Sequence, residues 1–126
     1  MAQEVVQTGQ TVQTQTVKIR KYFRSTEYGG FDRTWIISAG GQFIRPVVSE
    51  RSKSGRHGWD IWQLPAGKYA IISASRPNMQ NGQKPFEIRL QCVEVDNGLK
   101  ILSSKVIYVM SFGKDDLVEW ARGICP

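Results

Sequence analysis

Residues 59–75 read WDIWQLPAGKYAIISAS, two strand-like segments that a short turn joins. In WDIWQL the side chains alternate, so that Trp59 and Trp62 fall on opposite faces of a strand. Pro65 is suited to the first corner of the tight turn PAG, and the apolar run after it is typical of a buried strand. The stretch predicts two core strands in a β-rich fold. Each tryptophan shares its face with an aliphatic residue, so this pattern leaves open which tryptophan is buried.

Strand patterns of the same kind occupy most of the remaining chain. Glycine, proline and asparagine separate them, as expected for turns between antiparallel strands. Asn97-Gly98 is the strongest hairpin signal, because this dipeptide favours a type I′ turn. Pro46 cannot donate a ladder hydrogen bond, which places its segment at a sheet edge or at a bulge. The other predicted strands are VKIRKYFR (17–24), RTWIIS (33–38), QFIRPVV (42–48), FEIRLQCVEV (86–95) and LKILSSKVIYVMSF (99–112).

The chain ends in a helix pattern, KDDLVEWAR (114–122). Asp115 and Asp116 lie in its first turn, where the helix dipole favours carboxylates. Gly123 follows and is suited to a C-cap. We therefore expect one terminal helix that packs its apolar side chains on an end or a face of the sheet.

These patterns favour a mainly β fold, an antiparallel β-sandwich or a partly open barrel of about eight strands with one C-terminal helix. Residues 17–126 are expected to form a single β-rich domain, which agrees with a length of 126 residues. Residues 1–16 are rich in Gln and Thr and poor in apolar side chains. We expect a flexible polar arm there. A strand through which the chain forms a homo-oligomer or binds a partner is the alternative.

Composition places the chain among globular proteins, with 40% hydrophobic and 22% charged residues. No apolar run approaches the ~20 residues of a membrane helix, so no membrane partner is expected. The first residues lack the basic start and the apolar core of a signal peptide. We therefore expect an intracellular protein, unless it leaves the cell as part of a particle.

The positive charge is concentrated in one part of the chain. The formal net charge is +6. Residues 18–56 hold nine basic and three acidic residues, which accounts for the whole excess, because the rest of the chain holds eight of each. Such asymmetry indicates a polyanionic partner. The plainer interpretation is that the charge only keeps the protein soluble.

No residue pattern indicates catalysis, a cofactor or a metal site. His57 is the only histidine, and it sits in the basic loop 49–58 without the histidine, cysteine or acidic partners that a metal site needs, as a solvated histidine would. Cys92 and Cys125 lack the spacing of a zinc site. They are either two unrelated thiols or a bond that ties the C-terminal tail to the sheet. No nucleophile, phosphate-loop, zinc-protease or dinucleotide motif is present. We expect a protein that is not an enzyme.

Nucleic-acid binding has the most support in the sequence. Lysine and arginine bind phosphates, and aromatic rings stack on the bases of single strands. Strand alternation puts four such residues of segment 17–24 on one face, and the basic loop lies ahead of a tryptophan. We expect phosphate contacts from Lys18, Arg20, Arg24, Arg51, Lys53 and Arg56, and stacking on Tyr22 and Trp59. DNA and RNA fit equally, and the residues indicate no base preference.

Two other classes of function use the same residues. A particle or assembly protein would combine a sandwich domain with an arm that orders on assembly and a basic face toward a packaged genome. A sandwich that binds carbohydrate or protein would use exposed tryptophans, but the net charge gives it no support. A basic strand face is also common protection of a sheet edge against aggregation.

Residues 64–69, LPAGKY, resemble the hairpin corner of transthyretin-like and related β-sandwich modules, where a Leu-Pro-x-Gly-x-Tyr turn joins two core strands. The resemblance covers about 14 residues with its flanks, and it implies a sandwich and no activity. The whole chain also looks like the small uncharacterised proteins of globular viruses that infect hyperthermophilic archaea. That resemblance implies a viral protein located in the host cytoplasm or the virion, and it favours a Cys92–Cys125 bond, because disulfides are common inside hyperthermophiles.

Overall fold

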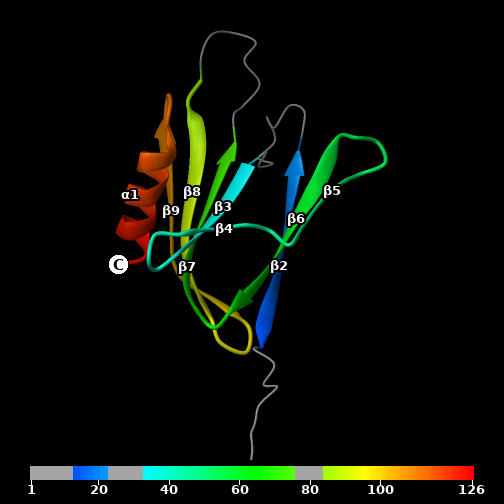
Figure 1. The fold of residues 1–126 in the computed structure, drawn as a ribbon. Helices are drawn as coiled ribbons and strands as arrows, with labels where there is room; N and C mark the ends of the chain where they lie inside the picture. Colours follow the sequence, from blue (N-terminus) through cyan, green and yellow to red (C-terminus); the bar gives the residue numbers. More distant parts are fainter. Residues whose placement is uncertain (1–12, 23–32, 76–83) are drawn as a thin grey trace, which may run out of the picture.

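The structure, a computed structural model, describes residues 13–22, 33–75 and 84–126. Within these ranges, eight strands form two antiparallel sheets, and one helix lies beside the larger sheet (Figure 1). The smaller sheet has the strand order β2-β6-β5 and the larger one β4-β3-β7-β8-β9. The predicted mainly β fold with a C-terminal helix is confirmed, and the described strands form two open sheets and no closed barrel. The elements are β2 (Thr14–Tyr22), β3 (Arg33–Ser38), β4 (Phe43–Ile44), β5 (Val48–Arg51), β6 (His57–Pro65), β7 (Gly67–Ser75), β8 (Phe86–Val95), β9 (Leu99–Val109) and α1 (Lys114–Ile124).

Several boundaries differ from the sequence expectation. Strand β2 begins at Thr14, so the last residues of the predicted arm, which was to end at residue 16, are part of the smaller sheet. The predicted strand 42–48 is split around Pro46 into β4 at the edge of one sheet and β5 at the edge of the other. Helix α1 continues through Gly123 and ends on Cys125 as its C-cap, so the predicted glycine cap is wrong. The Asn97-Gly98 hairpin is confirmed, with both residues at positive φ.

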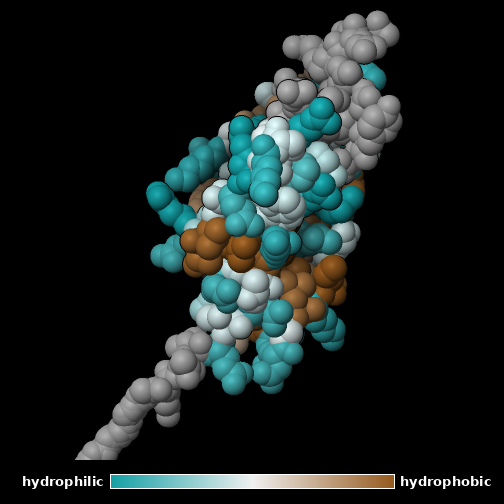
Figure 2. Space-filling view, turned by 90° about the vertical axis from the view of Figure 1, so that its right-hand side faces the viewer, coloured by the Kyte–Doolittle hydropathy of each residue, from teal (hydrophilic) through white to brown (hydrophobic). Residues whose placement is uncertain are grey.

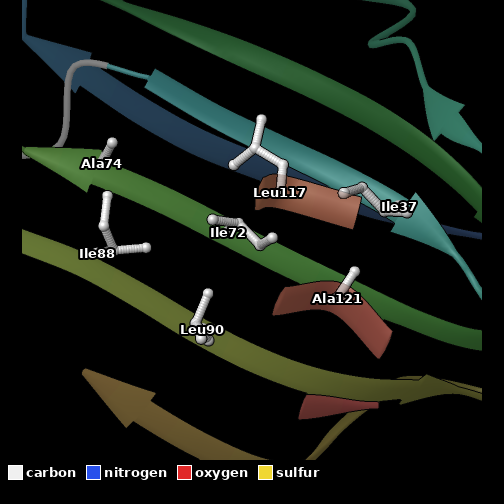
Figure 3. Packing of buried hydrophobic residues seen from close by; sticks show 8 residues of the cluster. Ile37, Ile72, Ala74, Ile88, Leu90, Leu117 and Ala121 are labelled. Atoms are coloured by element: carbon white, nitrogen blue, oxygen red, sulfur yellow. The ribbon is translucent and has the colours of Figure 1, made fainter. Parts of the chain in front are cut away.

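Two apolar clusters hold three layers together. One lies between the sheets and is centred on Trp62, Leu64 and Ile71, with Val17 and Ile19 packed against it. The other lies between the larger sheet and α1, where Leu117 and Ala121 pack on residues of β3, β7 and β8 (Figure 3). Successive side chains of β7 belong alternately to the two clusters, so this strand is buried over most of its length.

The corner between β6 and β7 carries the chain from one sheet to the other. The hydroxyl of Tyr69 donates a hydrogen bond of 2.8 Å to the carbonyl oxygen of Pro65. Gly67 has φ +153°, a backbone conformation that side chains disfavour, and it lies beside the Tyr69 ring. A tyrosine that bonds back to the backbone a few residues upstream is a recurrent corner in β-sandwiches. The turn predicted to join two core strands does so between the two sheets.

A disulfide between Cys92 and Cys125 ties α1 to strand β8. The two Cα atoms lie 5.0 Å apart, and the cysteines are 33 positions apart in the chain. In the chain-entropy description, closing a loop of this size stabilises the folded state by about 3–4 kcal/mol. Of the two alternatives for these cysteines, the structure has the bond that ties the tail to the sheet.

The Tyr69 corner predicts a pH-dependent stability. Burial raises the pKa of the Tyr69 phenol above its ordinary value. The unfolded chain therefore loses this proton first, and the folded state loses stability as the pH rises above ~10. Tyr69→Phe should lower the free energy of unfolding at pH 7 by about 1–3 kcal/mol, because the Pro65 carbonyl loses its donor. Urea denaturation of both proteins at neutral and alkaline pH measures this. The account of the corner is wrong if the variant is as stable as the parent at pH 7, or shows an equal alkaline loss.

Candidate functional site

The middle strand of the smaller sheet, β6, decides which side chains face outward. Trp62 is 1% exposed and belongs to the inter-sheet core. Trp59 is three residues earlier and therefore lies on the other face of β6. The open question of which tryptophan is buried is thus answered, with Trp62 inside and Trp59 on the outer face.

The register of β2 against β6 completes the outer face. Arg20 lies opposite Trp59, Lys18 opposite Ile61, and Tyr22 opposite His57. Opposite residues of an antiparallel pair share a face. Lys18, Arg20, Tyr22 and Trp59, four of the predicted contact residues, are therefore brought together. We call these four residues the β2–β6 face.

Two cations flank one indole on this face. The Lys18 Nζ atom is 5.2 Å from the centre of the Trp59 ring, and the Arg20 guanidinium carbon is 5.8 Å from it. The same guanidinium lies 5.5 Å from the Tyr22 ring. These are cation–π distances. Figure 2 shows the side of the molecule that carries the smaller sheet, with hydrophilic side chains above and below hydrophobic patches.

His57 takes part in this cluster, although it was not among the predicted contact residues. It is the first residue of β6, and Arg20 Nη2 lies 3.2 Å from His57 Nε2. Because arginine only donates, His57 Nε2 is the acceptor in this contact. The imidazole also stands edge-on to the Trp59 ring, with centres 5.1 Å apart. The predicted loop position is wrong, because His57 begins β6, whereas its half-exposed side chain and its solvent-exposed contact with Arg20 agree with the predicted solvation. His57 comes two residues before Trp59, and residues two apart in a strand share a face, so the spacing was the signal that both lie on the same side.

The inner face of the same strands explains a cation that interrupts an apolar pattern. Lys21 Nζ forms an ion pair of 2.9 Å with Asp60, whose carboxylate also accepts a hydrogen bond of 2.6 Å from the Ser49 hydroxyl. Asp60 is 5% exposed. This buried carboxylate is therefore paired and hydrogen-bonded across all three strands of the smaller sheet, and it fixes their register.

The basic loop lies at the end of the sheet where Tyr22 and His57 pair. It connects β5 to β6 as a hairpin, closed by a hydrogen bond from Ser52 N to His57 O. Lys53 and Arg56 are exposed in it. Arg51 of β5 lies opposite Gly58 of β6. Its side chain therefore starts on the inner face of the sheet, whereas Trp59 is on the outer face. Arg24, also predicted as a contact, lies outside the described residues.

Among the described residues, one carboxylate lies on the outer face. Glu50 of β5 is exposed and sits opposite Trp59 on the side away from β2. It divides the face electrostatically, because cations flank the indole from β2 and an anion flanks it from β5. A polyanion would therefore be drawn toward the β2 side of Trp59.

Residues 13–22, 33–75 and 84–126 contain no group of three or more His, Cys, Asp or Glu side chains that could hold a metal ion. In the same part of the chain, no helix is long and apolar enough to cross a membrane.

No protein-family model, curated protein or solved structure is significantly similar to this chain.

Proposed function

We propose that this protein binds single-stranded nucleic acid through the β2–β6 face, without catalysing a reaction. The observation that carries the proposal is the pair of cations, Lys18 and Arg20, held over the outward-facing indole of Trp59. Phosphate neutralisation and base stacking are the two contributions that single-strand binders combine. Here both come from adjacent strands, on rigid elements.

A nucleic-acid strand would bind by replacing a cation on the Trp59 indole with one of its bases. The base of one nucleotide stacks on Trp59, and the displaced cation moves to the neighbouring phosphate. His57 holds the Arg20 guanidinium near the ring and so keeps the charge where the phosphate arrives. Lys53 and Arg56 extend the charge beyond the end of the sheet. The bases of a duplex are stacked on one another, so a duplex would gain the phosphate contacts alone.

Little in this arrangement would read a base sequence. The face is open, and its donors belong to flexible cationic side chains. Stacking is tolerant of sequence because every base has a π face. We therefore propose a binder of low sequence specificity.

The proposal predicts a specific salt dependence. Four phosphate contacts, from Lys18, Arg20, Lys53 and Arg56, would give a slope of log K against log[salt] of about −3 for a single strand. Arg20→Ala with Arg56→Ala should reduce the steepness by about 1.4.

Trp59→Ala should weaken binding by about 1–3 kcal/mol per stacked base and leave the slope unchanged. Glu50→Gln should strengthen binding. Fluorescence anisotropy of labelled oligonucleotides at several salt concentrations measures all four proteins.

The matched control is Lys100→Ala with Lys105→Ala, which removes the same charge from β9 in the other sheet. It should leave the slope near its parent value. The proposal fails if single strands do not bind at low salt. It also fails if the β9 control changes the slope as much as the β2 and loop variant does.

A second candidate function is assembly with further copies of the chain. In the part of the chain that the structure describes, β9 pairs only with β8 and is the outermost strand of the larger sheet. Six of the eight large hydrophobic side chains that are exposed there lie in residues 99–110. Tyr108 is 63% and Ile101 54% exposed. A long apolar edge strand is a template for pairing with another strand.

The sequence of β9 suits pairing with itself. An antiparallel pair with its twofold axis at Val106 places Ser104 opposite Tyr108 and Lys105 opposite Ile107. Those partners share a face, and no lysine lies opposite another lysine. The pairing of β9 with β8 is irregular at Leu102, because Cys92 lies opposite Ser103 and the next residue, Val93, lies opposite Ile101. Pairing of β9 with a second copy would therefore involve residues 103–109. We propose this edge, distinct from the N-terminal arm, as the place where two copies would meet.

Sedimentation velocity tests the assembly candidate. The parent protein should sediment as a dimer at micromolar concentration, and Val106→Lys should sediment as a monomer, because two charges would meet on the axis. Val48→Lys changes an equally exposed valine that lies in β5 and should stay dimeric. A monomeric parent, or a dimeric Val106→Lys variant, would contradict the β9 pairing.

A further inference from the structure

A second group of cations over aromatic rings lies on the other side of the larger sheet, beside the start of α1. A cavity of about 420 Å³ opens between β3, β4 and the N-terminal end of α1. Its volume falls in the range of small-molecule sites. We call it the α1 groove. The residues that line it are Arg33, Trp35, Phe43, Phe112, Gly113, Lys114 and Leu117.

The walls of the α1 groove are aromatic. Phe112 is the centre of a cluster in which the rings of Trp35, Phe86 and Trp120 lie 5.1–5.8 Å from its own. Trp35 and Phe86 meet it edge-on. All four rings are half-buried, so their packing fixes them while part of each ring remains accessible. Of these four rings, Trp35 and Phe112 line the groove, and they offer rigid stacking surface to a planar ligand.

Two cations stand over aromatic rings that line the groove. The Arg33 guanidinium carbon is 5.3 Å from the centres of Trp35 and Phe112, and Lys114 Nζ is 5.3 Å from the centre of Phe43. Both side chains are exposed, and neither makes a hydrogen bond or an ion pair with another described residue. Their donors are thus available for an anion. The described residues that line the groove include no carboxylate.

The helix start itself is not the basis of the site. The N-cap amide of Gly113 already donates to the Asp116 carboxylate at 2.8 Å, so that donor is occupied. Asp115 and Asp116 also place negative charge in the first turn. The attraction for an anion comes instead from the two side chains that stand over the rings.

We propose that the α1 groove binds a nucleotide, with the base against the aromatic cluster and the phosphate between Arg33 and Lys114. The volume, the aromatic walls and the two cations together match a ligand that is aromatic at one end and anionic at the other. Free nucleotides and the nucleotides of a strand share this chemistry. The inference goes beyond the β2–β6 face and needs neither Trp59 nor Arg20.

Nuclear magnetic resonance of the ¹⁵N-labelled full chain tests the inference with AMP as the probe. AMP should shift the amide signals of Phe112, Gly113 and Lys114 and the indole signal of Trp35, with a dissociation constant of about 1 mM or tighter. Adenosine and inorganic phosphate should each bind more weakly than AMP, because each supplies half of the contacts. Arg33→Gln with Lys114→Gln should weaken AMP at least about tenfold while the other signals of the spectrum stay in place.

A matched variant separates this inference from the proposed function. Lys18→Gln with Arg20→Gln removes two cations from the β2–β6 face and should leave AMP binding unchanged, whereas it weakens an oligonucleotide. If AMP binds but oligonucleotides do not, the α1 groove takes a free nucleotide and the proposed function fails alone. If an oligonucleotide shifts the same groove signals at lower concentration, the groove takes a nucleotide of a strand. The inference is overturned if AMP shifts none of these signals, if adenosine binds as tightly as AMP, or if the groove variant keeps its affinity.

Discussion

The burial of Trp62 is the constraint on which the rest of the smaller sheet depends. Its side chain fills the space between the sheets, and its indole N–H donates a hydrogen bond of 2.9 Å to the carbonyl oxygen of Ile44. Removing a fully buried tryptophan costs about 3–5 kcal/mol. A shift of β6 by one residue would turn Trp62 outward and bury Trp59 instead. The core therefore decides which aromatic and basic side chains face solvent.

The pairing of charges on the inner side reinforces the same register. Asp60 lies next to Trp62 on the face that packs toward the other sheet, and Lys21 and Ser49 satisfy it from the two neighbouring strands. A buried carboxylate without these partners would be costly. Burial and pairing thus agree on one alignment of β2, β6 and β5. That alignment places Arg20 opposite Trp59, and the candidate interface is the outward consequence of the inward packing.

Alternation and turn residues were sufficient to predict the class of fold, because they are local properties of the chain. The β7 and β8 strands, the Asn97-Gly98 hairpin and the terminal helix follow from them. The choice between Trp59 and Trp62 was not local, since it depends on which face meets the second sheet. The same holds for the split at Pro46 and for the Cys92–Cys125 bond. Of the candidate site, strand parity predicted Lys18, Arg20 and Tyr22 together, whereas pairing with β6 brought in His57 and turned Arg51 away.

The central claim is that β6 presents Trp59, and not Trp62, to a bound single strand. Fluorine resonance of protein labelled with fluorotryptophan tests it directly, because each of the four tryptophans gives its own signal. Assignment by single substitution to phenylalanine identifies the two signals. On addition of a single-stranded oligonucleotide, we expect the Trp59 signal to shift and the Trp62 signal to stay. An oligonucleotide that binds and leaves the Trp59 signal unchanged would contradict the account.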